Sequence, residues 1–200
     1  MPEARRSRRL FFALWPSDAL RQRVAAQTAA RARRSGGRPV PPENLHVTLF
    51  FLGQVRETHL PDVLAAAASL RGSAIEIDFD GVEVLRGSRV LCLTAQETPA
   101  SLAALLDALR GALQPLGFEA DRWRFRPHVT LARDVPRPGR RGAAGEPQNP
   151  RERLPEPLCW TANEFALVES TATPAGSTYT VLARWPLSEQ DRDRSPASCS

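Results

Sequence analysis

Residues 42–53 of this 200-residue chain read Pro-Glu-Asn-Leu-His-Val-Thr-Leu-Phe-Phe-Leu-Gly, and residues 126–133 read Arg-Pro-His-Val-Thr-Leu-Ala-Arg. Both stretches contain the tetrapeptide His-Val-Thr-Leu, so two of the three histidines in the chain occur in the same local sequence. A matched pair of this kind arises by chance far less often than a single short motif. The repeat therefore predicts two related halves, one around each copy.

The alternation within each tetrapeptide predicts a β-strand with two different faces. In a strand, residues i and i+2 point to the same side, so His46 projects with Thr48 and His128 projects with Thr130. The valine and leucine of each copy project to the other side and suit a hydrophobic core. If the two strands face each other about an approximate dyad, two imidazoles and two hydroxyls converge on one cleft.

Two imidazoles on opposite sides of a phosphorus atom suit an in-line displacement. One ring removes a proton from the nucleophile while the other protonates the leaving oxygen, and both have an unperturbed pKa near neutrality. The hydroxyls of Thr48 and Thr130 are suited to donate hydrogen bonds to the non-bridging oxygens. A lone histidine on a strand is more often structural, but the matched pair favours catalysis. We expect no metal ion and no cofactor.

The rest of the chain mixes short strands with three helices, which predicts an α+β architecture rather than a doubly wound sheet. Helices are expected from Ser17 or Asp18 to about residue 34, from residue 60 to Gly72, and from Thr98-Pro99 to Gly117, with Thr98 as a cap. Residues 134–157, rich in proline, glycine and arginine, predict a flexible loop, and the polar residues 188–200 predict a disordered tail. Residues 1–187 then form a single domain.

The charge balance narrows the class of partner. All 27 positive residues are arginine, and 22 acidic residues leave a net charge of +5, which favours a polyanionic partner without proving one.

No apolar run approaches the length of a membrane span, and the N-terminal residues lack the pattern of a signal peptide. The three cysteines form no C-x-x-C pair, which argues against a zinc knuckle. We therefore expect a cytoplasmic protein and, by default, a monomer.

These residues resemble a known family. The paired His-x-Thr-Leu motifs are similar to those of the 2H phosphoesterase superfamily, and more closely to those of the RNA 2′,3′-cyclic phosphodiesterases, formerly called 2′-5′ RNA ligases. The similarity runs from residue 9 to residue 187 and departs in the loop 134–157 and in the tail. It implies a bilobal fold in which two antiparallel sheets with flanking helices surround a central cleft, with pseudo-twofold symmetry.

The resemblance also implies a role for each residue of the two motifs. His46 would be the proton donor to the leaving 3′ oxygen, and His128 the proton acceptor that activates water, so that a 2′-phosphomonoester remains. Thr48 and Thr130 would bind the phosphate. Arg133 is a further expected phosphate contact, although strict alternation places it on the opposite face from His128 unless a bulge turns it round.

Two further expectations concern the RNA. Phe12 or a neighbouring aromatic residue would stack on the base next to the cyclic phosphate, the alternative being that Phe11 and Phe12 are both core residues. The arginines of the loop 134–157, Arg140 and Arg141 among them, would either follow the RNA backbone or belong to a solvated insertion.

Three alternatives stay open at the level of sequence. The same site would also suit a small cyclic nucleotide, or reversible 2′-5′ joining of RNA ends. A third possibility is a non-catalytic module that binds a nucleotide or RNA and whose histidines only hydrogen-bond phosphate. A bell-shaped pH profile is expected for the enzyme and no turnover for the binding module.

Overall fold

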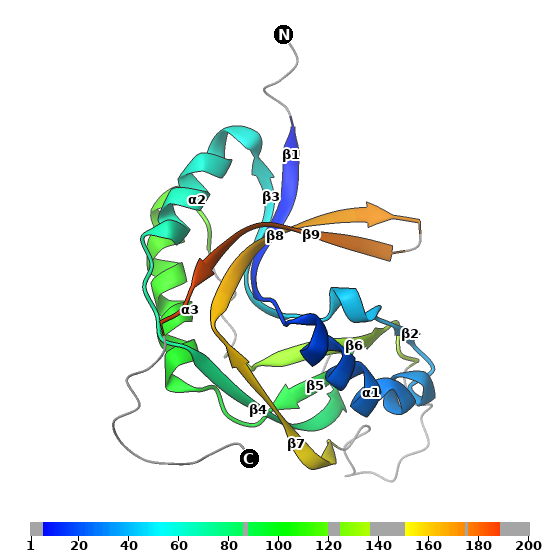
Figure 1. Cartoon of the computed structure of the whole chain (residues 1–200). Coiled ribbons are helices and arrows are strands. Elements are labelled where there is room, and N and C mark those ends of the chain that lie inside the picture. Colours follow the sequence, from blue (N-terminus) through cyan, green and yellow to red (C-terminus); the bar gives the residue numbers. More distant parts are fainter. Residues whose placement is uncertain (1–5, 86–87, 120–124, 137–150, 175, 189–200) are drawn as a thin grey trace, which may run out of the picture.

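The computed structural model describes residues 6–85, 88–119, 125–136, 151–174 and 176–188. Within these ranges the chain forms two sheets and three α-helices (Figure 1). The α-helices are α1 (Asp18–Arg34), α2 (Leu60–Ala68) and α3 (Ala100–Leu113), and short 3₁₀ turns lie at Pro42–Asn44, Glu57–His59 and Gln114–Leu116. The strands are β1 (Ser7–Leu14), β2 (Arg38–Pro39), β3 (Val47–Arg56), β4 (Ile75–Val84), β5 (Leu91–Ala95), β6 (His128–Arg133), β7 (Glu152–Ala162), β8 (Glu164–Thr173) and β9 (Gly176–Pro186).

The strands pair in two antiparallel sheets, as predicted. The first sheet has the order β3-β1-β8-β9, and the second has the order β2-β6-β5-β4-β7. The two copies of His-Val-Thr-Leu therefore lie in different sheets, on β3 and β6, and these two strands contact each other. The helices α2 and α3 lie together, α3 against β3, while α1 lies against β2 and β6 (Figure 1). The predicted α+β fold is confirmed.

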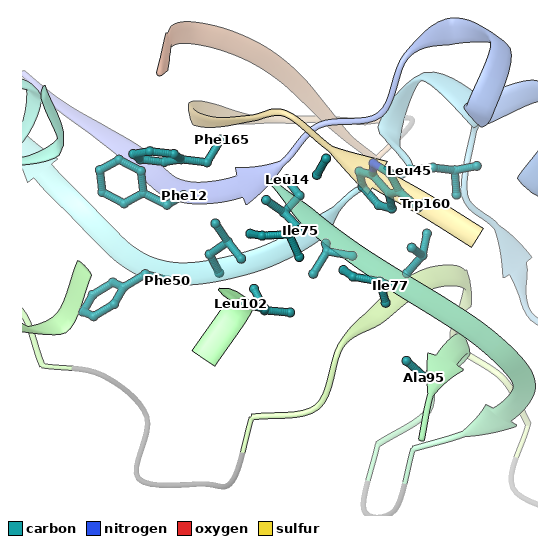
Figure 2. Packing of buried hydrophobic residues seen from close by; sticks show 14 of the residues in the cluster. Phe12, Leu14, Leu45, Phe50, Ile75, Ile77, Ala95, Leu102, Trp160 and Phe165 are labelled. Atoms are coloured by element: carbon teal, nitrogen blue, oxygen red, sulfur yellow. The ribbon is translucent and has the colours of Figure 1, made fainter. Parts of the chain in front are cut away.

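Strand β1 is apolar on both faces and so separates two hydrophobic clusters. Leu10, Phe12 and Leu14 belong to the main core, in which Phe12 lies beside Phe165 (Figure 2). Phe11 and Ala13, on the other face, pack with Ala166 and Val168 of β8 in a smaller cluster. A strand with apolar residues on both faces is expected where both sides of a sheet are covered.

The helices begin and end largely where the sequence predicts. The Ser17 hydroxyl accepts a hydrogen bond from the Leu20 amide at 3.3 Å and caps α1. Thr98, in contrast, does not cap α3: its hydroxyl donates to the Phe125 carbonyl at 3.3 Å, and Pro99 occupies the N-cap position. The prediction for Thr98 was wrong because this tertiary hydrogen bond orients the hydroxyl toward Phe125 and the helix begins one residue later than the sequence suggests. Gly117 has a φ of +84°, which suits glycine at the point where the helical segment stops.

The predicted loop 134–157 ends earlier than the sequence indicates. Strand β7 already begins at Glu152, although the segment contains Pro155 and Pro157. It is the edge strand of the second sheet, and residues 154–157 lie between the paired positions Arg153–Gly81 and Leu158–Phe79. Prolines are tolerated at such a position because a bulge on an edge strand requires no ladder hydrogen bond from them. Residues 137–150 of the predicted loop lie outside the described residues.

The C-terminal boundary also differs by one residue from the prediction. The Ser188 amide donates to the Gly72 carbonyl at 2.8 Å, and the Ser188 carbonyl accepts from the Ala74 amide at 2.6 Å. Ser188 therefore belongs to the fold, and the rest of the predicted tail, residues 189–200, lies outside the described residues. In the part of the chain that the structure describes, we find no helix with the length and apolar character needed to cross a membrane.

Candidate active site

A β-bulge occurs at the same position of both tetrapeptides. In β3, Thr48 pairs with Ala13 and Phe50 pairs with Phe12, so that Leu49 is an extra residue without a partner on β1. In β6, Thr130 pairs with Cys92 and Ala132 pairs with Leu91, so that Leu131 is the extra residue. A bulge of one residue reverses the alternation of faces beyond it.

The two bulges place equivalent residues of the two strands in equivalent environments. From Val47 to Phe51 the side chains are buried, half-buried, buried, buried and exposed, and the sequence of burial is the same from Val129 to Arg133. Arg133 therefore reaches the face of His128 and Thr130, and these three residues line one cavity. The bulge that Arg133 needed to reach this face is present.

Both imidazole rings are held by a backbone carbonyl two residues earlier in the chain. His46 Nδ1 lies 2.7 Å from the Asn44 carbonyl oxygen, and His128 Nδ1 lies 2.8 Å from the Arg126 carbonyl oxygen. Because a carbonyl only accepts hydrogen bonds, Nδ1 carries a proton in both rings, and Nε2 is the nitrogen left for chemistry. His46 Nε2 lies 3.1 Å from the Thr48 hydroxyl oxygen.

A surface cavity of about 410 Å³ joins the two motifs. Thr48 and Phe51 of β3 line it on one side, and His128, Thr130 and Arg133 of β6 line it on the other. His46 is not one of the residues that line the cavity, but its Nε2 lies 3.1 Å from the hydroxyl oxygen of Thr48, which does line it. The positive charges of Arg133 and His128 contribute to the lowered pKa of His46. The structure thus brings Thr48, His128, Thr130 and Arg133 to one cavity, with His46 in contact with Thr48.

Three aromatic rings surround the His46 imidazole. The centroid of the His46 ring lies 5.0 Å from the centroid of Phe11, 5.5 Å from that of the stacked Trp15 and 5.1 Å from that of the edge-on Tyr179. Burial lowers the pKa of His46 from 6.5 to about 4, and the positive charges of Arg133 and His128 act in the same direction against the opposing hydrogen bond to Asn44. In the free protein at neutral pH, His46 is therefore uncharged.

The predicted stacking role of Phe12 is wrong. Its side chain is fully buried, with ring centroids 6.2 Å from Phe165 and 5.9 Å from Trp185 in the main core (Figure 2). Among the aromatic residues that line the cavity, Phe51 is the exposed one, at 46%, while Phe125 is half-buried. Phe51 stacks on Phe11 at 6.2 Å, and the Arg9 guanidinium lies 5.0 Å from its centroid.

The sequence reasoning missed Phe51, Trp15 and Tyr179 as parts of the site. Simple alternation places Phe51 with Leu49 on the core face, and only the bulge at Leu49 brings it into the cavity. Trp15 directly follows the first strand, and Tyr179 comes from a strand more than 130 residues beyond His46. The odd-numbered aromatic positions Phe11, in the first strand, and Trp15, directly after it, were the available signal.

Cys92 lies directly across from Thr130 but is not part of the chemistry. Its side chain is fully buried, as the sequence predicts for a small hydrophobic residue in a strand. Burial raises the pKa of its thiol to about 12, against smaller opposing effects that include a hydrogen bond with Thr130. Cys92 therefore stays a neutral thiol at physiological pH and is no nucleophile.

The arginines of the predicted loop have different fates. Arg137, Arg140 and Arg141 lie outside the described residues, so their expected contact with RNA stays a prediction. Arg151 directly precedes β7, and its side chain pairs with Asp80 of β4 and approaches Glu83 at 3.4 Å. Burial acts to raise the pKa of Asp80, but the hydrogen bond and charge of Arg151 hold it below the ordinary value. This arginine therefore stabilises the fold through its ion pairs.

Among the described residues, no group of three or more His, Cys, Asp or Glu side chains is arranged to hold a metal ion.

Fold and site together define a two-lobed α+β protein with one histidine motif in each sheet. The sequence pattern of the 2′-5′ RNA ligase superfamily matches residues 16–174, and the chain belongs to that superfamily. The resemblance expected from the sequence is thus confirmed.

Individual relatives narrow the family further. A protein of Thermus thermophilus named RNA 2′,3′-cyclic phosphodiesterase is 35% identical over 195 residues, which cover 90% of each chain. A protein of Escherichia coli with the same name is 29% identical over 185 residues, covering 90% of this chain and 97% of the relative. The crystal structure of E. coli LigT complexed with 3′-AMP matches with a TM-score of 0.77 at 28% identity, over 92% of this chain and all of that one.

Proposed function

We propose that this protein hydrolyses the 2′,3′-cyclic phosphate at the end of an RNA to a 2′-phosphomonoester, by acid–base catalysis with two histidines. One observation carries the proposal. His46, directly before β3, and His128, on β6, are each fixed at Nδ1 by the carbonyl of residue i−2, and one cavity is lined by His128, Thr130 and the Thr48 that contacts His46. The names of the relatives point to the same substrate.

The two imidazoles divide the proton transfers between them. His128 Nε2 takes a proton from water as the water attacks phosphorus, and His46 Nε2 gives a proton to the departing 3′ oxygen. The P–O3′ bond breaks as the new P–O bond forms, so the phosphate remains on the 2′ oxygen. The hydroxyls of Thr48 and Thr130 and the guanidinium of Arg133 hold the non-bridging oxygens, where negative charge is concentrated.

Because its pKa is low, His46 can act as the proton donor only after it has taken up a proton. An uncharged His46 has no proton at Nε2 to give, so it has to gain one when the substrate binds. The cyclic phosphate is an anion, and an anion next to an imidazole favours the charged form and raises the pKa. Substrate binding and protonation of His46 are therefore coupled, and His46 is uncharged in the free protein.

Phe51 takes the base-stacking role that Phe12 cannot fill. Its exposed ring lies at the same cavity as His128 and Arg133, and Phe11 supports it from within the sheet. A purine or pyrimidine stacked on such a ring gains about 1–3 kcal/mol with little dependence on sequence. The expected substrate is therefore an RNA end, without selection of the base by this contact. We expect the protein to act as a cytoplasmic monomer.

The test is turnover of a short RNA with a 2′,3′-cyclic phosphate end in the presence of EDTA. Wild type, His46→Ala and His128→Ala are compared, and the product end is mapped as a 2′- or 3′-phosphate. We expect a 2′-phosphate from wild type and a loss of at least about a hundredfold in each variant. Wild type that binds the RNA without turning it over would identify a binding module instead. A 2′-5′ linked product from RNA ends would indicate ligation.

A further inference from the structure

A half-buried carboxylate on β4, two strands from the second motif in the same sheet, has three polar partners. Glu83 on β4 is held by the Thr94 hydroxyl, which donates to its Oε1 at 2.9 Å. The same oxygen lies 2.7 Å from the Arg126 guanidinium and 3.4 Å from the Arg151 guanidinium. The Glu83 side chain is 17% exposed. A carboxylate that is shielded from water and shared by two cations interacts with them more strongly than a surface ion pair does.

One of these partners connects Glu83 to the catalytic histidine. The Arg126 carbonyl is the acceptor that fixes His128 Nδ1 at 2.8 Å. The Arg126 side chain is held at a second point, because its Nε donates to the Ala95 carbonyl at 3.3 Å. Pro127 follows and restricts the backbone of Arg126 to the extended region. The guanidinium and the carbonyl of Arg126 are therefore linked through a short segment with little conformational freedom.

The first motif is built in the same way from different residues. Asn44 stands two residues before His46, and its carbonyl fixes His46 Nδ1 at 2.7 Å. Its side chain is anchored in turn, since Asn44 Nδ2 donates to the Ser177 carbonyl of β9 at 2.9 Å. In both halves, the residue at position i−2 binds the imidazole through its backbone and a neighbouring strand through its side chain. At Arg126 the partner of the side chain is the Glu83 carboxylate. Replacing Glu83 with glutamine removes its charge and keeps its size.

We propose that Glu83 is a positioning residue for His128 and acts through Arg126. Its carboxylate holds the Arg126 guanidinium against β4, and this keeps the Arg126 carbonyl directed at His128 Nδ1. The carbonyl in turn fixes the ring in the tautomer whose Nε2 accepts a proton from water. Without the carboxylate charge, two guanidinium groups stand close together with one counter-charge fewer, and Arg126 turns away. This inference rests on the proposed function, because it assigns Glu83 a part in the same reaction.

The test compares Glu83→Gln with Glu83→Asp and a matched control. The glutamine keeps the size and the bond to Thr94 but removes the charge, whereas aspartate keeps the charge at a shorter reach. The control is Glu152→Gln, since Glu152 lies in the same sheet and pairs with Arg31 at 2.7 Å without contact to Arg126. We expect Glu83→Gln to lower kcat about tenfold with KM within about twofold, because a displaced catalytic group costs rate more than binding. Glu83→Asp recovers part of the loss, and the control changes neither parameter.

A second readout follows the tautomer directly. In ¹⁵N NMR spectra recorded where His128 is neutral, the wild-type ring carries its proton at Nδ1. We expect Glu83→Gln to give a mixture of Nδ1 and Nε2 tautomers, with no change in the control. All variants are compared at temperatures below their unfolding transitions, so that lost stability does not enter the rates.

Two results would overturn the proposal. One is a Glu83→Gln variant with wild-type kcat and a single Nδ1 tautomer. The other is a loss that the control shares, because it would show that any lost ion pair in this sheet has the same effect. If wild type does not turn over the cyclic phosphate, the proposed function fails, whereas the tautomer of His128 still shows whether Glu83 positions the ring.

Discussion

Opening the aromatic surroundings of His46 is expected to raise its pKa. Tyr179 is the ring most accessible to substitution, since it lies half-buried on the edge strand β9 and meets His46 edge-on at 5.1 Å. Replacing it with alanine admits water to one side of the imidazole, and hydration favours the charged form. Tyr179→Phe is the matched control, because it keeps the ring and removes only the hydroxyl.

The magnitude follows from the depressed pKa. A shift from 6.5 to about 4 corresponds to about 3 kcal/mol between the two protonation states. If the three rings contribute comparably to the burial, removal of one restores about 0.8 pKa unit, or about 1 kcal/mol. The pKa of His46 in Tyr179→Ala is then about 5, and the protonated fraction at pH 7 increases about sixfold.

The assay is an NMR titration of the His46 Cε1 proton in the wild type and the two variants. A paired measurement of the free energy of unfolding against pH checks the same quantity. Because the native pKa lies below that of the unfolded chain, the unfolded state takes up the proton first, and stability is lost as the pH falls from about 6.5 to about 4. In wild type His46 accounts for about 3 kcal/mol of that loss, and in Tyr179→Ala for about 2 kcal/mol.

The same variant distinguishes donor from acceptor. If His46 is the proton donor, kcat/KM at pH 7 is limited by the protonated fraction, and Tyr179→Ala partly offsets any loss of binding by raising that fraction. In the profile of kcat/KM against pH, the alkaline limb moves to higher pH, because the pKa of the donor is higher. A wild-type His46 that titrates near 6.5, or a titration that Tyr179→Ala leaves unchanged, would refute the reasoning about burial.

Three other changes test separate parts of the site. Phe51→Ala is expected to raise KM for an RNA end by about tenfold, from a lost stacking energy of about 1–3 kcal/mol, while Phe51→Trp retains the affinity; steady-state kinetics with a cyclic-phosphate dinucleotide measure both. Arg133→Met is expected to weaken inhibition by inorganic phosphate and to raise the pKa of His46, because it removes a nearby positive charge; an unchanged inhibition constant would place Arg133 away from the phosphate. Cys92 is expected to react with iodoacetamide only as fast as the protein unfolds, so its alkylation rate follows denaturant concentration, and rapid alkylation of the native protein would contradict its burial.

Much of the fold follows from local patterns in the sequence. The His-x-Thr alternation places both motifs on strands, and the leucine spacing of residues 102–113 defines the buried face of α3. These features are visible because each depends on residues close together in the chain. The loop 134–157 was predicted too long, since the prolines of β7 are compatible with a strand only at a bulged sheet edge, and a sheet edge is not a local property.

The composition of the site is less accessible from sequence for the same reason. His46, Thr48, His128 and Thr130 follow from the repeat. The choice between Phe12 and Phe51, in contrast, depends on a single unpaired residue, Leu49, that reverses the alternation of the strand. The pKa of His46 depends on rings from β1, the turn after it and β9, which come together only in the folded chain.

The paired bulges also determine the direction in which a substrate lies. Up to the bulge, both halves present an imidazole and a hydroxyl, and aromatic rings surround the imidazole of His46. Two residues beyond the bulged leucine, one half presents the aromatic ring of Phe51 and the other presents the cation of Arg133. A nucleotide is itself polar in this sense, with a flat base at one end and a charged phosphate at the other. One residue of difference between two equivalent strands thus makes the two sides of the cavity chemically different, so we expect a bound nucleotide to place its base toward Phe51 and its phosphate toward Arg133.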